Sequence, residues 1–276
     1  MVNFNNIWAV ARMERRQTRR LARYWVFLVI AYGFGIFGYV YYSALHALFS
    51  SLSASVGMIG PRYLMGAIAL YYLIGFVLGI VFLGFDVRAR DIREGIVEVL
   101  DARPLTNFEL VTGRFVALFL SGWIPIVVLV VLIQGLGLLL PLLGSPIGST
   151  VEPLSLVNFA VFMAVPGLVF AIGLVFVITL LVRHRLVAAL LAIAAIVGLF
   201  WGLFTVPGTI APYFDFLGVA QAAFPSDFVP GFLLPGGWWH RVGVLAIGLG
   251  LVGIAAAIHP REIGRASCRE RVSECV

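Results

Sequence analysis

The chain has 276 residues, of which 62% are hydrophobic and only 12% are charged. A soluble domain carries roughly a quarter charged residues, so this composition excludes an ordinary water-soluble globular protein. The formal charge of +6 comes with no lysine at all, since every one of the 19 basic residues is arginine. A Walker A loop needs a lysine to reach the β- and γ-phosphates of ATP, so this chain has no standard P-loop ATPase site of its own.

Residues 1–23 are predicted to form a basic, interfacial elbow helix. Phe4, Ile7 and Trp8 fall at helical spacing, and six arginines follow them before the first apolar run. The alternative is the n-region of a signal peptide, but the apolar run that follows is too long and lacks a clear small-residue cleavage site. We therefore expect a retained helix that lies at the membrane surface and leads into a first span.

Six apolar runs follow, each long enough to cross the ~30 Å hydrocarbon core as a helix. They lie near 24–45, 63–85, 115–140, 156–182, 186–206 and 240–258. Pro125 and Pro166 fall inside the third and fourth runs and predict kinks there. Gly75 and Gly79 in the second run predict close helix packing, either within the bundle or against a second subunit. We expect 24–261 to form one all-α, polytopic domain with six transmembrane helices.

The positions of the arginines predict which side of the membrane each loop faces. Six at the N-terminus, five in 86–114, two in 183–185 and Arg261 make fourteen on one side, against only Arg62 and Arg241 on the other. Positively charged loops stay in the cytoplasm, so both termini are predicted to be cytoplasmic in a multi-pass protein of the inner (plasma) membrane. This distribution also argues against a nucleic-acid partner as the reason for the positive charge.

The connection 207–239 is predicted to contain re-entrant helices on the outer side, before the last span. It has five prolines, yet it is also rich in phenylalanine, leucine and tryptophan. A long loop of this kind would not stay in water, so we expect short helices that dip into the outer leaflet, where the bundle protects their backbone. Trp238 and Trp239 would then lie at the membrane interface.

The span interiors argue against an enzyme. Their central stretches contain no Asp, Glu, His, Lys or Arg, and such residues are usually present in a membrane when a reaction or a proton pathway needs them. The four histidines lie at span ends and far apart in sequence, which does not predict a metal site: His46, His184, His240 and His259. Both cysteines, Cys268 and Cys275, lie in the last nine residues, so no disulfide framework or cofactor site is expected.

The segment 86–114, between the second and third runs, is the most informative. Ile92, Ile96 and Leu100 form an apolar stripe at helical spacing, and charged residues cover the rest. Pro104 ends that helix, and we expect Asn107 to cap a second one that continues into the third span. The pattern predicts an amphipathic helix along the cytoplasmic face. The alternative is a solvated connector that contacts nothing.

The same segment resembles the signature of type-2 ABC permeases, which runs approximately R-E-x-G-T-x-E-x-L, then P-L, E-L and G-K. The matching residues are Arg93-Glu-Gly-Ile-Val-Glu98, Leu100, Arg103-Pro-Leu105, Glu109-Leu110 and Gly113-Arg114. Ile96 replaces a threonine and Arg114 replaces a lysine, and both changes are mild. The elbow helix, six spans, cytoplasmic termini and re-entrant outer helices resemble that family as well, over essentially 1–261.

The resemblance implies that 86–114 is the coupling element that docks on a separate ATP-binding subunit. The residues that it marks for this contact are Arg93, Glu94, Gly95, Glu98, Arg103 and Pro104. ATP and Mg²⁺ would be bound by the partner, whose closure would push the element and switch a cavity from inward-open to outward-open. A second permease half, identical or paralogous, would complete the exporter. The lining without fixed charge favours an apolar or amphipathic cargo.

Two other classes of function stay open on the residues alone. The chain could be a non-transport membrane anchor or assembly protein that recruits an ATPase or another partner. A membrane enzyme is the third class, which the empty span interiors disfavour. In each case the lipid bilayer is the surrounding solvent.

The last residues, 262–276, are excluded from this reasoning. Glu262-Ile-Gly-Arg-Ala-Ser-Cys-Arg-Glu-Arg-Val272 matches the translation of a common sequencing adapter, and such segments must be set aside before a fold is inferred. The alternative is a genuine polar cytoplasmic tail. We expect the natural protein to differ from this sequence after Arg261.

Overall fold

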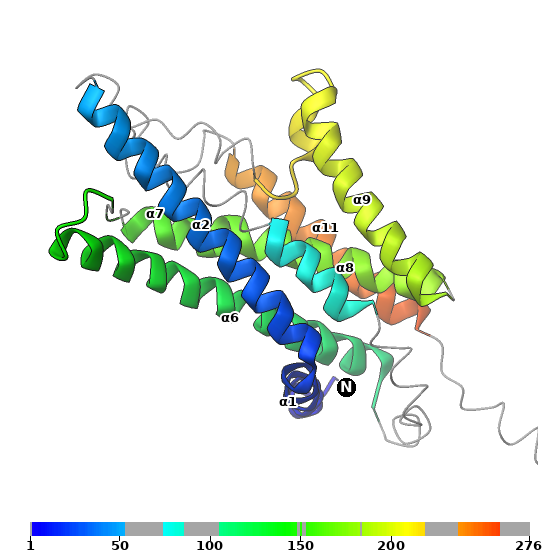
Figure 1. The fold of residues 1–276 in the computed structure, drawn as a ribbon. Coiled ribbons are helices and arrows are strands. Elements are labelled where there is room, and N and C mark those ends of the chain that lie inside the picture. The colour runs from blue at the N-terminus through cyan, green and yellow to red at the C-terminus, as the bar shows by residue number, and fades with distance from the viewer. Residues whose placement is uncertain are drawn as a thin grey trace, which may run out of the picture.

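The computed structural model describes residues 2–52, 74–85, 105–147, 150, 153–182, 184–218 and 237–259, and they form helices and connecting turns without a strand. Five helices are long and apolar enough to cross a membrane. Four of them are α2 (Ala22–Leu52), α6 (Asn107–Leu142), α9 (Arg185–Thr205) and α11 (Gly237–Ile258). The fifth is a continuous helix made of α7 (Pro153–Asn158), η1 (Phe159–Met163) and α8 (Ala164–Leu181). The chain is therefore an all-helical, multi-pass membrane protein (Figure 1).

Five of the six predicted spans coincide with these helices. Their bounds agree within three residues, except that α6 begins at Asn107, eight residues before the expected start at 115. The second, expected at 63–85, is described only over the apolar helix Ile74–Gly84. In Figure 1 the first residues of α2, α6 and α9 and the last residues of α8 and α11 lie at one end of the bundle. The helices thus alternate in direction, as short connections between consecutive spans require.

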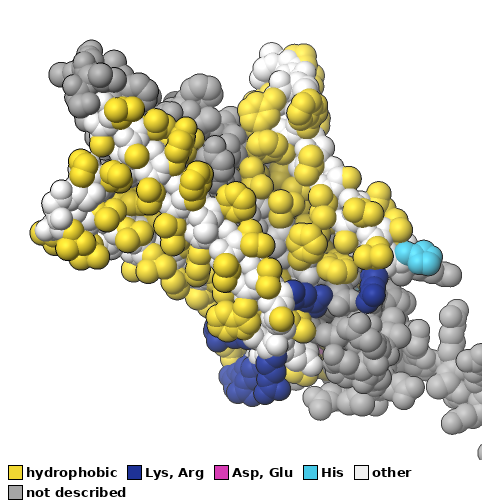
Figure 2. Space-filling model, in the orientation of Figure 1, with side chains coloured by type: hydrophobic (Ala, Val, Ile, Leu, Met, Phe, Trp, Pro, Cys, Tyr) yellow, Lys and Arg dark blue, Asp and Glu magenta, His cyan; other side chains and the backbone are white. Residues whose placement is uncertain are grey.

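A separate helix, α1 (Phe4–Arg20), precedes the bundle and packs against the start of α6. Figure 1 shows it almost end-on, so it crosses the direction of the long helices. Ile7, Val10 and Ala11 form its buried face, while Arg12, Arg16, Arg19 and Arg20 are exposed. In Figure 2 the basic side chains gather at this end of the bundle, and apolar side chains cover the rest of the visible face.

The helix Ile74–Gly84 lies against α2 through its glycines. A Cβ on Gly79 would overlap the ring of Phe27, and one on Gly75 would lie 3.6 Å from the Cα of Ala31. Phe27 also meets the ring of Phe76 edge-on, with ring centroids 5.3 Å apart. Of the two sequence interpretations of the Gly75/Gly79 pair, the structure supports packing within the chain.

The helices α8 and α11 form the centre of the bundle, and glycines bring them together. A Cβ on Gly248 would lie 2.7 Å from the backbone nitrogen of Phe170. A Cβ on Gly173 would lie 2.6 Å from the carbonyl oxygen of Gly248. The two backbones are therefore in direct contact, which only glycine permits at these positions. The helix α9 packs on α8, and its other side exposes large apolar residues such as Trp201 and Phe204.

The predicted re-entrant connection 207–239 is described only over 207–218. There the short helix η2 (Ala211–Phe214) packs against the end of α9, and Phe216 and Leu217 are buried. The ring of Phe216 lies 5.2 Å from that of Phe170 in α8, measured between centroids. This part of the connection thus folds into the bundle instead of extending away from it.

Candidate functional site

The first turn of α6, which follows the predicted coupling segment, is closed by a capping box. The hydroxyl of Thr106 accepts from the backbone N–H of Glu109 at 3.2 Å, and the Glu109 carboxylate accepts from the N–H of Thr106 at 2.8 Å. The expectation that Asn107 is the cap was wrong. Thr106 holds that position because its side chain pairs reciprocally with a glutamate three residues on, which satisfies two amides at once.

Asn107 has a different role, since its side chain connects α6 to the end of α11. Its Nδ2 donates to the backbone carbonyl of His259 at 2.9 Å. The last carbonyls of a helix lack partners within the helix, so this bond satisfies a group just beyond the end of α11. It also fixes the start of α6 to the end of the last described helix.

Glu109 connects the same turn to α1. Its Oε1 accepts from the backbone N–H of Asn3 at 2.6 Å, and its Oε2 lies 3.5 Å from the Nδ2 of Asn6. The side chain is only 2% exposed, so its negative charge is held by hydrogen bonds from both helices instead of by bulk water. We call Asn3, Thr106, Asn107, Glu109 and Gly113 the α6 junction.

Gly113 completes the α6 junction by letting α1 approach closely. A Cβ at this position would lie 2.7 Å from the Cβ of Val10 and 2.9 Å from the carbonyl oxygen of Ile7. No larger residue fits there without moving α1, because one of the two obstructing atoms belongs to the backbone. The ends of α1, α6 and α11 are therefore tied together at the point where the predicted coupling segment enters the bundle.

The capping box gives a direct test of the α6 junction. We expect Thr106→Ala to lower the free energy of unfolding by about 1 kcal/mol, within the usual range for losing a helix N-cap. Thr106→Ser keeps the hydroxyl and should be close to wild type. The measurement is the thermal unfolding midpoint of the purified protein in detergent. Equal midpoints for the Ala and Ser variants would contradict the assignment of Thr106 as the cap.

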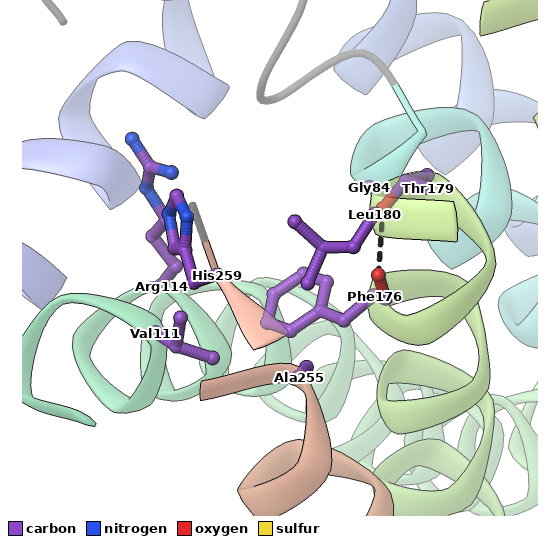
Figure 3. Close-up of a pocket in the computed structure, with 8 residues that line it drawn as sticks. All are labelled: Gly84, Val111, Arg114, Phe176, Thr179, Leu180, Ala255 and His259. Atoms are coloured by element: carbon purple, nitrogen blue, oxygen red, sulfur yellow. Dashed lines mark hydrogen bonds between the residues drawn. The ribbon is translucent and has the colours of Figure 1, made fainter. Parts of the chain in front are cut away.

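Arg114, the last residue of the permease-like motif, borders a small cavity of about 30 Å³ at the same end of the bundle. The cavity could hold one or two water molecules and is too small for a cargo molecule. Figure 3 shows Arg114 beside His259 on one side of the cavity, with Phe176 and Leu180 on the other. The hydroxyl of Thr179 donates to the carbonyl of Phe176 at 2.9 Å and so belongs to the helix wall.

The six residues predicted to contact an ATP-binding subunit lie outside the described residues. They are Arg93, Glu94, Gly95, Glu98, Arg103 and Pro104. Their role as a docking site stays a prediction. The structure describes the last part of that segment, from Leu105 onward, where it leads into α6.

Arg241 lies at the start of the sixth predicted run, and the sequence did not predict that it is buried. Its side chain is 2% exposed and lies inside the bundle near the start of α11. Its Nε donates to the carbonyl of Phe162 at 2.9 Å, and its Nη2 donates to that of Met163 at 2.8 Å. Its Nη1 donates to the carbonyl of Phe216 at 3.0 Å.

Pro166 removes the usual helical donor from one of the carbonyls that Arg241 contacts. Pro166 has no N–H, so the carbonyl four residues earlier, that of Phe162, cannot form its helical hydrogen bond. The π-helical segment η1 lies in this same region and disturbs the regular pattern further. Arg241 supplies the missing donor to Phe162, and the indole of Trp123 donates to the carbonyl of Ala160 at 2.9 Å.

The guanidinium also holds the segment after η2 in place. Besides Phe216, it contacts the carbonyl of Asp215 at 3.4 Å. The Asp215 side chain is 3% exposed, and its negative charge is close enough to act on Arg241. Gly218 has φ +80°, and a Cβ there would lie 3.2 Å from the Nη1 of Arg241. Arg241 thus joins η1, α11 and the residues after η2 through backbone groups.

The α6 junction and the Arg241 site are built in a similar way. Within the described ranges, no three His, Cys, Asp or Glu residues come together in a way that could hold a metal ion. Both sites consist of charged side chains bound to backbone groups, which fixes helices relative to one another. No protein-family model matches the chain, and no curated protein matches it either.

Proposed function

We propose that this chain is the membrane-spanning permease subunit of an ATP-driven ABC exporter, coupled through 86–114 to a separate ATP-binding subunit. No comparison identifies a family, so the proposal depends on this chain's own residues. It has several apolar spans, a charged segment with the permease-like motif, and no lysine for a P-loop of its own. The observation that carries it is the α6 junction.

The α6 junction favours mechanical coupling because it lies immediately after the proposed docking residues. Glu94 and Glu98 precede Thr106 by 12 and 8 residues, so a force applied to them would be passed to Thr106 along the coupling segment. There the hydrogen bonds of Glu109 and Asn107 connect α6 to α1 and to the end of α11. The 36 residues of α6 extend about 54 Å, longer than the ~30 Å hydrocarbon core. A push at one end would therefore tilt α6 and move three helix ends together.

The proposed orientation places the α1 end of the bundle in the cytoplasm. The arginine count predicts this side, and the basic side chains in Figure 2 gather there. An ATP-binding subunit in the cytoplasm would then face α1 and the coupling segment. A second permease half would be needed to enclose a cargo pathway, and the exposed apolar side of α9 is available for either lipid or that partner.

The test is reversal of charge in the coupling segment. We expect the double variant Glu94→Arg, Glu98→Arg to lose co-purification with its ATP-binding subunit, because like charges across a docking surface cost several kcal/mol. Glu152→Arg is the matched control, since the predicted topology places it on the other side of the membrane. It should co-purify normally. Unchanged association of the double variant would contradict the coupling assignment.

The same preparation distinguishes export from simple anchoring. An exporter couples ATP turnover to its own conformation, so the ATPase rate of the complex should respond to apolar or amphipathic cargo. An anchor or assembly protein would bind the ATPase without changing its turnover. Association with an unresponsive rate would therefore favour the anchor function.

A further inference from the structure

The π-helical segment η1 interrupts the fourth span, and side chains of two other helices bind its carbonyl groups. Trp123 of α6 donates its indole N–H to the carbonyl of Ala160 at 2.9 Å. Arg241 of α11 donates to the carbonyls of Phe162 at 2.9 Å and Met163 at 2.8 Å. Three of the five carbonyls in η1 therefore accept a hydrogen bond from outside the span.

Two hydroxyl groups in the spans show a contrasting arrangement. Ser121 donates to the carbonyl of Ala117, and Thr179 donates to that of Phe176, so each bond moves with the helix that contains it. The bonds to η1 are different, because each one depends on where α6 or α11 lies relative to the fourth span. Sharp bends in helices occur at π-helical turns and at prolines, and here η1 is followed by Pro166.

The fourth span has a second way to satisfy these carbonyls. In η1 a donor lies five residues after its acceptor, whereas in a regular α-helix it lies four residues after. With α-helical bonding, Ala160 and Met163 would each accept from an N–H of their own helix. Only the carbonyl of Phe162, which faces Pro166, would stay without a helical donor. The segment thus has two bonding arrangements, and the donors from α6 and α11 favour the π-helical one.

Both donors belong to helices that the α6 junction holds. The ring of Trp123 stacks on Phe119, and that of Phe119 stacks on Phe115, with centroids 6.1 Å apart in each pair. This column of rings fixes the indole to α6. Arg241 lies on α11, and the carbonyl just beyond the other end of α11 accepts from Asn107. A movement of α6 or α11 at the α6 junction therefore moves the groups that hold η1.

We propose that η1 is a hinge in the fourth span and that Trp123 and Arg241 are the latches that hold it in one of two conformations. Gly173 and Gly248 keep α8 in backbone contact with α11, so the part of the span after η1 stays in place. When the latches release, α7 tilts about η1 relative to α8. The proposal goes beyond the proposed function and does not depend on it.

The experiment measures distances between two spin labels by double electron–electron resonance, on the full chain in nanodiscs with its two cysteines replaced by serine. Labels at Val157 on α7 and Leu138 on α6 report on the hinge. Labels at Leu181 on α8 and Phe108 on α6 lie on the other side of η1, and all four positions are exposed. Val157 is about 9 Å from the end of η1 along the helix, so a tilt of about 20° moves it by about 3 Å.

Trp123→Phe is the informative variant, because phenylalanine keeps a stacked ring and loses only the N–H that binds Ala160. It should add a second distance to the 157–138 pair, shifted by about 3 Å, and leave the 181–108 pair unchanged. Trp25→Phe is the matched control. Its indole also donates to a backbone carbonyl at 2.9 Å, that of Arg19, but it lies in α2 and does not contact η1. It should leave both pairs as in wild type.

The double variant Trp123→Phe, Arg241→Lys weakens both latches and should increase the population of the second distance. One unchanged 157–138 distance in the single and the double variant would overturn the proposal, because η1 would then be a fixed kink. Equal changes of the two label pairs in Trp123→Phe would also overturn it, because the lost bond would then loosen the whole bundle. So would the same second distance in Trp25→Phe.

Discussion

Replacement of Arg241 by methionine should lower the free energy of unfolding by about 3–5 kcal/mol, which is typical for removing one partner of a buried charged network. Methionine fills a similar volume but donates no hydrogen bond. The carbonyls of Phe162, Met163 and Phe216 then lose the donor that the buried guanidinium provides. Pro166 has no N–H that could replace this donor at the carbonyl of Phe162.

The measurement is an SDS titration of the protein in mixed micelles, followed by circular dichroism. Arg241→Lys should have an intermediate stability, because one ammonium cannot reproduce the forked donation of a guanidinium. Arg20→Met, at an exposed position in α1, is the control and should remain close to wild type. A wild-type stability for Arg241→Met would mean that the guanidinium contributes nothing to holding α8 and α11 together.

Two glycines of α11, only two residues apart, should respond to alanine with opposite signs. A Cβ on Gly248 meets backbone atoms of α8 at 2.7 to 2.9 Å, and the backbone of Phe170 cannot rotate away. Gly248→Ala should therefore separate the helices and cost about 1–3 kcal/mol. Gly250 has open space around it, so Gly250→Ala should stabilise α11 slightly, since alanine favours a helix by up to about 1 kcal/mol.

The same titration compares the two variants directly. Helix propensity alone would make both alanine variants more stable than wild type, so only the contact with α8 can give them opposite signs. If Gly248→Ala is as stable as Gly250→Ala, the close approach of α8 and α11 is not the contact that holds the centre of the bundle.

The spans could be predicted from the sequence because each one depends on the average composition of about twenty residues, which does not require knowledge of any neighbour. The bounds of α9 and α11 differ from the expected runs by no more than three residues. The sequence predicted that Gly75 and Gly79 pack closely against another helix, but it did not predict which one. Small residues fit a helix of the same chain and a helix of a second subunit equally well.

The sequence contains the signal for the cap of α6 but does not decide the cap residue. Thr106 followed by Glu109 is the spacing of a capping box, and it was missed because Asn107 is also a favourable cap residue. Only the structure decides between them, since the choice depends on where the helix begins. The contacts of Glu109 with Asn3 were not predictable, because they depend on how α1 crosses α6.

The sequence placed Arg241 at the start of the last span but did not predict its burial, because a hydropathy pattern does not give the contacts of a side chain. The signal that pointed to its burial was Pro166. A proline inside a span leaves one carbonyl without a donor, and that carbonyl must find one from a neighbouring helix. Which helix supplies it is a question of three-dimensional packing, and in this protein the answer is α11, about 75 residues later in the chain.

Site-specific cross-linking from the coupling segment tests the central claim most directly. A photoreactive amino acid placed at Glu94 or Glu98 of the full chain in cell membranes should form an adduct with a P-loop ATP-binding subunit, identified by mass spectrometry. The same group at Glu152 should not form this adduct. Adducts only with lipid or unrelated proteins, or an equal yield at Glu152, would contradict the account that this segment couples the spans to an ATPase.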